Sequence, residues 1–199
     1  MSGADRTPSG SRAPEVDARV VTIAGEHEDH YDPDFYIYND VLVTHPSGEL
    51  KLYGYPREVF PPTDFHSATT VGDRIVLIGC LGYPSQRRHG VTPVFALDTA
   101  SLAITRLVTA GAAPGWIYEH TATLSDDGRS IVVRGGRCAV RAGGGGEEEI
   151  RENFDDWSLD RDTRPVDAPH RAPMGRLEPG ARRRIPQPPL HPREALVEP

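Results

Sequence analysis

The 199-residue chain lacks any apolar run near the roughly 20 residues that a membrane-spanning helix needs. Its first 16 residues are polar and contain no apolar core of a signal peptide, and the whole sequence has only two cysteines. Two cysteines cannot build a disulfide framework, so we expect reduced thiols and a cytoplasmic location. Lysine is nearly absent, since Lys51 is the only one, and the net charge is −7. From these absences we expect that the protein binds neither a membrane nor a nucleic acid.

The sequence also lacks a sustained period of 3.6 residues. It contains 20 Gly and 19 Pro, and breakers at that frequency leave no room for a helical bundle. Short β-branched runs bounded by Gly, Pro, Asn and Asp are present instead, which is typical of strands and turns. We therefore expect an all-β fold. The predicted strands are residues 19–23, 41–44, 50–53, 67–71, 74–78, 94–97, 104–108, 121–124 and 130–133.

Charge is distributed unevenly along the chain. Residues 164–199 contain seven Arg, four acidic residues and nine Pro, a net charge of +3, which leaves −10 (−7 minus +3) for residues 1–163. A segment with so much Pro and so little apolar pattern buries too little surface to offset its ordering entropy. We expect residues 164–199 to be a disordered Pro/Arg-rich tail and residues 1–16 to be a disordered N-terminal segment.

An internal repeat appears when the chain is shifted by about 54 residues. The segment His-Ser-Ala-Thr at 66–69 recurs as His-Thr-Ala-Thr at 120–123. Because they recur at equivalent positions, we expect His66 and His120 to be structural and to hydrogen-bond a neighbouring backbone. Apolar runs that end in small residues recur at nearly the same interval, and Gly is expected where inner strands converge. The glycines that mark these ends are Gly25, Gly79, Gly135 and Gly136.

Two stretches carry a family resemblance. His120-Thr121-Ala122 begins a segment that continues to the glycine pair at 135–136, and residues 94–98 read Val-Phe-Ala-Leu-Asp. On these motifs the sequence resembles the kelch repeat family over residues 20–163. Only the third repeat has both glycines, and the fourth-strand Trp of the family is absent from 50–53 and 104–108. The resemblance implies kelch-like β-propeller blades of four antiparallel strands, near residues 17–65, 66–119 and 120–163.

About three blades make an incomplete propeller, because closed propellers have roughly four to eight. An open stack of blades leaves edges and faces uncovered, which predicts self-association. A second interpretation concerns the abrupt change of composition after Thr163. Under that interpretation the chain is a truncated or frame-shifted fragment of a longer propeller protein.

Loops at one end of the blades are the expected binding region, because strands are occupied by packing. These loops are residues 26–34, 55–65, 82–92, 111–119 and 137–154. On them, Arg87 and Arg88 suit an acidic peptide or carboxylate, whereas Trp116 and Tyr118 suit either an aromatic contact surface or packing between blades. The candidate binding residues are His27, Asp29, His30, Asp32, Asp34, Asp64, Tyr83, Arg87, Arg88, Trp116 and Tyr118.

Residues 26–34 hold two imidazoles and five carboxylates, groups that suit a divalent metal. Their spacing matches neither an EF-hand nor a His-Glu-x-x-His helix, so a solvated acidic loop is the simpler interpretation; the metal candidates are His27, Asp29 and His30. The expected function is binding of a protein or peptide by a kelch-like scaffold, with no catalytic residue and no cofactor. The alternative is a metal-dependent or carbohydrate-acting enzyme that uses this loop.

Overall fold

The structure is a computed structural model that describes residues 19–27, 36–141, 146–161, 172–177 and 194–197. Within these residues the fold is all-β, with sixteen strands and one turn of 3-10 helix, η1 (Pro84–Gln86). The expected all-β class is therefore confirmed. The described residues contain no helix of the length and apolarity that crossing a membrane would require.

The second sheet in chain order follows the predicted alternation most closely. Its four strands are antiparallel and lie in sequence order, and their bounds agree with the predicted strands within two residues. Asp98 closes the last turn of this sheet, because its Oδ1 accepts hydrogen bonds from both the backbone N and the hydroxyl of Ser101, each at 2.7 Å. The strands are β4 (Ser67–Val71), β5 (Arg74–Ile78), β6 (Val94–Asp98) and β7 (Ile104–Arg106).

The first sheet combines the beginning of the chain with a distant strand. Its order is β16-β1-β2-β3, and β16 runs antiparallel to β1 with Arg19 opposite Val197. β3 forms the other edge and is exposed along its length. The strands are β1 (Arg19–His27), β2 (Tyr36–Thr44), β3 (Leu50–Gly54) and β16 (Glu194–Val197).

The remaining strands form a third sheet and a small three-stranded sheet. The third sheet has the order β10-β11-β14-β15-β8, in which β15 is antiparallel to β14 and parallel to β8. The three-stranded sheet has the order β13-β12-β9. The strands are β8 (Thr109–Ala110), β9 (Trp116–Tyr118), β10 (Thr121–Leu124), β11 (Ser130–Arg134), β12 (Arg137–Arg141), β13 (Glu148–Glu152), β14 (Asp156–Asp160) and β15 (Ala172–Leu177).

Two stretches of the tail expected to be disordered are strands in the structure. β15 pairs with β14, and β16 pairs with β1. Each gains its order from backbone hydrogen bonds to a strand elsewhere in the chain, which composition does not reveal. The rest of residues 164–199, and the whole of residues 1–16, lie outside the described residues.

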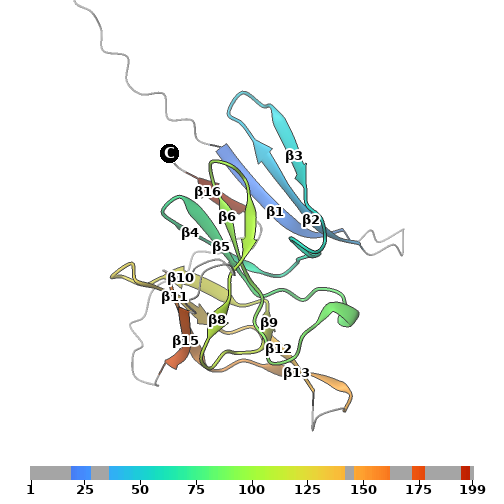
Figure 1. The fold of residues 1–199 in the computed structure, drawn as a ribbon, viewed down its shortest axis with the longest axis vertical. Coiled ribbons are helices and arrows are strands. Elements are labelled where there is room, and N and C mark those ends of the chain that lie inside the picture. The colour runs from blue at the N-terminus through green and yellow to red at the C-terminus, as the bar shows by residue number, and fades with distance from the viewer. Residues whose placement is uncertain (1–18, 28–35, 142–145, 162–171, 178–193, 198–199) are drawn as a thin grey trace, which may run out of the picture.

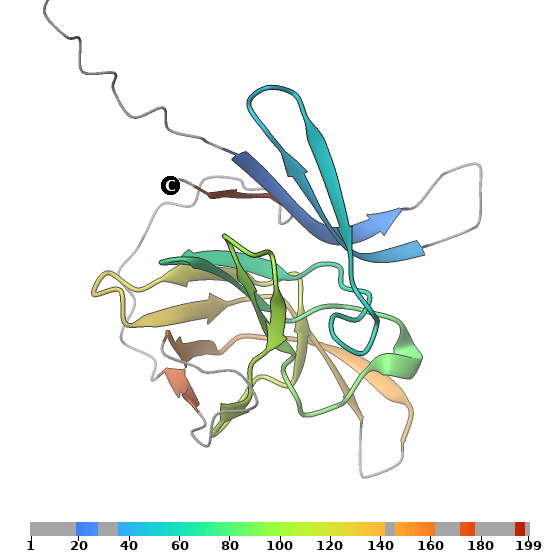
Figure 2. The ribbon, with the colours of Figure 1, turned by 45° about the horizontal axis from the view of Figure 1, so that its top comes forward.

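The three larger sheets are stacked, with the second between the first and the third (Figures 1 and 2). β5 contributes to both cores because its side chains alternate between faces. Ile75 and Leu77 belong to a core shared with the first sheet. The alternate residues, Val76 and Ile78, belong to a second core shared with the third sheet. The second sheet is therefore packed on both of its faces.

The backbone repeats where the sequence does. Phe65 and Glu119, which precede His66 and His120, both have a left-handed φ, of 46° and 54°. The backbone N of Glu119 donates a hydrogen bond of 2.9 Å to the carbonyl of Phe65. The two repeat positions therefore lie side by side at the junction of the second and third sheets.

Candidate functional site

Connections at one end of the second sheet enclose a cavity of about 450 Å³. The β3–β4 connection contributes Arg57 and Glu58, the β5–β6 connection contributes residues 85–88, and β9 contributes Trp116. These segments belong to three of the loops that the sequence predicted to lie together. The cavity is therefore formed by residues far apart in the chain.

Arg87 holds the β5–β6 connection in place. Its Nε donates to the carbonyl of Leu81 at 2.9 Å, its Nη2 donates to the carbonyl of Gly82 at 3.2 Å, and it forms an ion pair with Glu148 of β13. Only 8% of its side chain is exposed. Its donors are thus committed to the protein, and Arg87 is a wall of the cavity rather than a free cation.

Three other guanidinium groups line the cavity without such commitments. Arg57, Arg88 and Arg106 are exposed, and among the described residues none of them has a carboxylate partner. Glu58 is the single acidic residue of the described lining. The cavity is therefore locally positive in a chain whose net charge is −7.

The inner wall of the cavity is apolar apart from one amide. Phe95 and Trp116 are buried there, and the indole Nε1 of Trp116 donates to the carbonyl of Leu81 at 2.9 Å. Gln86 also lines the cavity, and its Oε1 is buried with no hydrogen-bond partner among the described residues. A buried acceptor without a donor is costly, so this amide lowers the stability of the connection.

Asp64 and Tyr83, both predicted as binding residues, form hydrogen bonds that connect the loops to the rest of the fold. The Oδ1 of buried Asp64 accepts a hydrogen bond from the backbone N of Gly82 at 2.7 Å. Burial raises the pKa of Asp64, while that hydrogen bond and the charge of Arg87 act in the opposite direction. The Tyr83 hydroxyl accepts a 3.0 Å hydrogen bond from the backbone N of Ile37.

The two predicted aromatic residues are buried. Trp116 lines the cavity from within, and Tyr118 packs with the guanidinium of Arg137 5.4 Å from its ring centroid. Of the two interpretations, this burial favours packing over an exposed aromatic surface.

The acidic loop is outside the described part of the chain except at its beginning. His27 is exposed at the end of β1, whereas the other candidates, Asp29, His30, Asp32 and Asp34, lie outside the described residues. Within the residues that are described, no group of three or more His, Cys, Asp or Glu side chains could hold a metal ion.

The repeated histidines occupy the junction between the second and third sheets. His120 Nε2 is 2.8 Å from the hydroxyl of Ser67, so the observed partner is a side chain rather than the expected backbone group. Burial, with a smaller contribution from His66, lowers the pKa of His120 to about 3. The imidazole is therefore neutral at physiological pH.

Close approach to Tyr118 and His120 explains the second glycine of the pair at 135–136. A Cβ on Gly136, whose φ is +80°, would lie 2.5 Å from the carbonyl oxygen of Tyr118 and 2.7 Å from the Cβ of His120. Gly135 also has a positive φ, of +63°, but a Cβ there would meet nothing within 4 Å. The second glycine of the pair is thus required by packing as well as by backbone conformation.

Both thiols are free, as expected, and both are buried. Burial raises the pKa of Cys80 beyond the ordinary range and raises the pKa of Cys138 to about 11. Neither thiol is therefore activated as a nucleophile.

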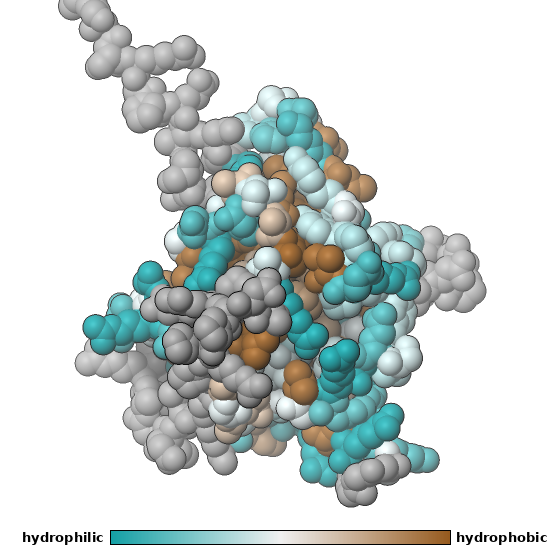
Figure 3. Space-filling view, in the orientation of Figure 1, coloured by the Kyte–Doolittle hydropathy of each residue, from teal (hydrophilic) through white to brown (hydrophobic). Residues whose placement is uncertain are grey.

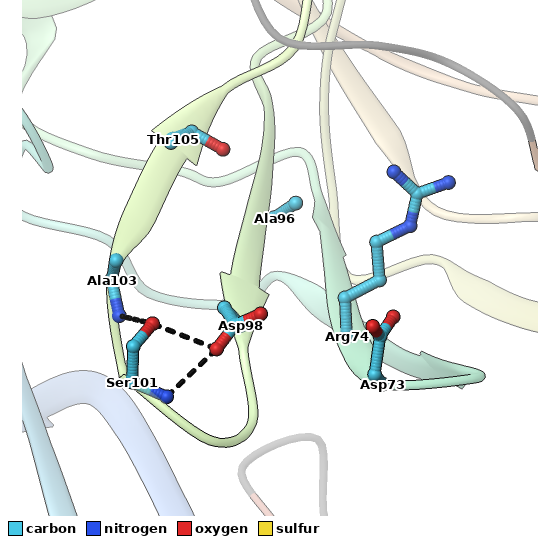
Figure 4. A pocket seen from close by; sticks show the side chains of 7 residues that line it. All are labelled: Asp73, Arg74, Ala96, Asp98, Ser101, Ala103 and Thr105. Carbon is cyan, nitrogen blue, oxygen red and sulfur yellow. Dashed lines mark hydrogen bonds between the residues drawn. The ribbon is translucent and has the colours of Figure 1, made fainter.

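A second depression, of about 330 Å³, lies at the β4–β5 and β6–β7 turns. Figure 4 shows Asp98 and Ser101 joined by hydrogen bonds on one side and Arg74 on the other. Because the turn uses Asp98 Oδ1 and the Ser101 hydroxyl, this depression offers fewer uncommitted groups than the cavity at the other end.

Comparison with protein-family models finds no match for this chain, and a search of curated proteins finds none either. Arg57, Gln86 and Arg106 were not singled out in the sequence. They are separated by 29 and 20 positions, and only the sheet register and the path of the connections bring them to one cavity.

Proposed function

We propose that this chain is a kelch-like β-propeller scaffold that binds a protein or peptide partner at the cavity of its loop end. The stacked sheets support this architecture because β1, β5 and β11 hold equivalent positions and lead to the glycine landmarks. β4 contacts both β10 and β16, as inner strands of neighbouring blades do. In this proposal the first blade takes its inner strand from β16.

The cavity is the observation that carries the proposed function. Two separate connections and residues of β6, β7 and β9 line it, which is how propellers and other rigid scaffolds build sites with loops. Its volume accommodates a few side chains of a partner rather than a whole domain. No catalytic group is assigned to it.

Peptide selection on the intact chain tests this function. A phage-displayed peptide library is selected against the parent, against Ser85→Trp, which fills the mouth of the cavity, and against the control Thr105→Trp in the depression at the other end. We expect the parent and the control to enrich the same peptides and Ser85→Trp to lose them. Equal enrichment by all three proteins, or none by the parent, would contradict the proposal.

The two alternatives stay predictions. A metal-dependent or carbohydrate-acting enzyme would use residues 26–34, most of which lie outside the described residues. The fragment interpretation rests on the change of composition after Thr163.

Self-association also stays a prediction, and β3 is the place to test it. Leu50 and Leu52 are 63% and 68% exposed on this edge strand, and Figure 3 shows apolar side chains at the upper right, over β3. Exposed apolar edges pair with other strands unless charges oppose it. Sedimentation of the parent and Leu52→Lys measures this: a dimer that the variant loses supports self-association, and a monomeric parent contradicts it.

A further inference from the structure

We propose that the cavity recognises carboxylates of an acidic peptide segment, an inference that rests on the proposed function and specifies its ligand. The first support is the imbalance of charge in the lining. The described lining contains three exposed arginines but a single glutamate, Glu58. Guanidinium groups bind carboxylates through two parallel hydrogen bonds, which gives geometric specificity as well as strength.

The contrast between Arg87 and its neighbour Arg88 is the second support. Arg87 is buried and bound to Leu81, Gly82 and Glu148, so the connection is rigid without help from Arg88. Arg88 is exposed and lines the same cavity. A structural role therefore accounts for one arginine of the pair and leaves the other available to a ligand.

The apolar wall indicates that the ligand is a peptide rather than a simple anion. Phe95 and Trp116 line the cavity with apolar rings next to the arginines. A peptide satisfies both features, because it carries apolar side chains beside its carboxylates. Inorganic phosphate satisfies only the arginines.

Overall charge favours a short acidic segment over a long polyanion. Residues 1–163, which contain the cavity, have a net charge of −10. A long polyanion such as a nucleic acid would extend beyond the cavity onto an acidic surface and be repelled. A segment of a few residues contacts only the positive lining.

The test uses the full chain and three probes. Binding of a fluorescent peptide, Glu-Glu-Leu-Glu-Glu amide, is measured by anisotropy and compared with its Gln-Gln-Leu-Gln-Gln analogue and with competition by inorganic phosphate. The variants are Arg57→Gln, Arg88→Gln and Arg106→Gln, with Arg141→Gln, exposed on β12, as the matched control. Because the three cavity arginines are exposed, the variants should keep the parental melting temperature, which is checked first.

We expect the acidic peptide to bind and each cavity variant to weaken it about tenfold, the effect of losing one charge-assisted hydrogen bond. Arg141→Gln should bind like the parent, and the Gln analogue should bind more weakly. Arg88→Lys should fall between the parent and Arg88→Gln, because lysine keeps the charge but not the planar fork.

Three outcomes would overturn the inference. Equal binding of the two peptides, unaffected by the arginine variants but abolished by Ser85→Trp, would remove the carboxylate specificity and leave peptide binding at the cavity intact. Binding of phosphate without binding of the acidic peptide would make the site a phosphate site. If no probe binds, the carboxylate inference fails, and the library selection decides separately whether the cavity binds peptides.

Discussion

Gly135 and Gly136 form a matched pair, and Gly→Ala should lower stability more at the second position than at the first. Both have a positive φ, so Gly→Ala costs each about 1–2 kcal/mol of backbone strain. The loss of chain entropy in the unfolded state is the same for both and cancels. Only at 136 would the new Cβ meet Tyr118 O at 2.5 Å, His120 Cβ at 2.7 Å and His120 Cα at 2.8 Å.

These contacts set the size of the difference. Two of the three atoms belong to the backbone, so the overlap is relieved only by shifting the junction, and overpacking of this kind costs about 1–3 kcal/mol. Gly136→Ala should therefore lose about 2–5 kcal/mol in total, against about 1–2 kcal/mol for Gly135→Ala. In a chain of this size the difference corresponds to about 2–12 °C in melting temperature.

Thermal and urea unfolding of the two variants, followed by circular dichroism, measures this difference directly. A melting temperature for Gly136→Ala equal to or above that of Gly135→Ala would refute the reasoning. It would mean that β12 does not approach His120 as closely as described.

Three further predictions concern buried polar groups. Because the pKa of His120 falls from 6.5 to about 3 on folding, the unfolded state binds more protons between these values. The free energy of unfolding should therefore fall as pH drops below 6.5, by up to about 1.4 kcal/mol per pH unit. When it is measured by urea unfolding between pH 5 and 7, the free energy of unfolding should change less with pH in His120→Gln than in the parent, and an equal change in both would contradict the assignment. Cys80 and Cys138 are 2% and 7% exposed, so a thiol reagent should label them slowly in the native protein and fully in denaturant, whereas rapid native labelling would count against their burial. Arg87→Met should lower stability by about 1–3 kcal/mol, since it removes the ion pair with Glu148 and the hydrogen bonds to the carbonyls of Leu81 and Gly82, and an unchanged urea midpoint would show that these contacts contribute nothing.

The second sheet was predictable because its signals are local. Each of its strands alternates or is β-branched, and turn residues such as Gly72 and Asp73 separate β4 from β5. The 54-residue repeat likewise located His66 and His120, since equivalent positions in a repeat keep equivalent environments. Both histidines are buried at the junction.

Non-local pairing explains what the sequence did not reveal. β16 reads Glu-Ala-Leu-Val and β15 contains Pro173, so neither carries a strong strand signal, and each depends on a partner strand made elsewhere. The hairpin of β12 and β13 was assigned to a loop for the same reason. Its strands alternate poorly, and β12 is fixed partly by pairing with β9.

The sequence analysis named the loops that border the cavity but only part of the cavity's lining. The sequence indicated the loops and named Arg88, yet it drew attention to the acidic residues 26–34 because charged groups cluster there in the chain. The arginines of the cavity are spread from 57 to 106, and a cluster that forms only through folding leaves no local signal.

The pairing of β1 with β16 means that β1 is synthesised long before its partner strand. Arg19 lies opposite Val197, a separation of 178 residues (197 minus 19). At translation rates of about 5–20 residues per second, the edge of β1 waits roughly 9–36 s before β16 exists to cover it. During that interval its unpaired N–H and C=O groups are open to strands of other nascent chains, so crowding of ribosomes on the message and the speed of translation become determinants of how much chain folds correctly.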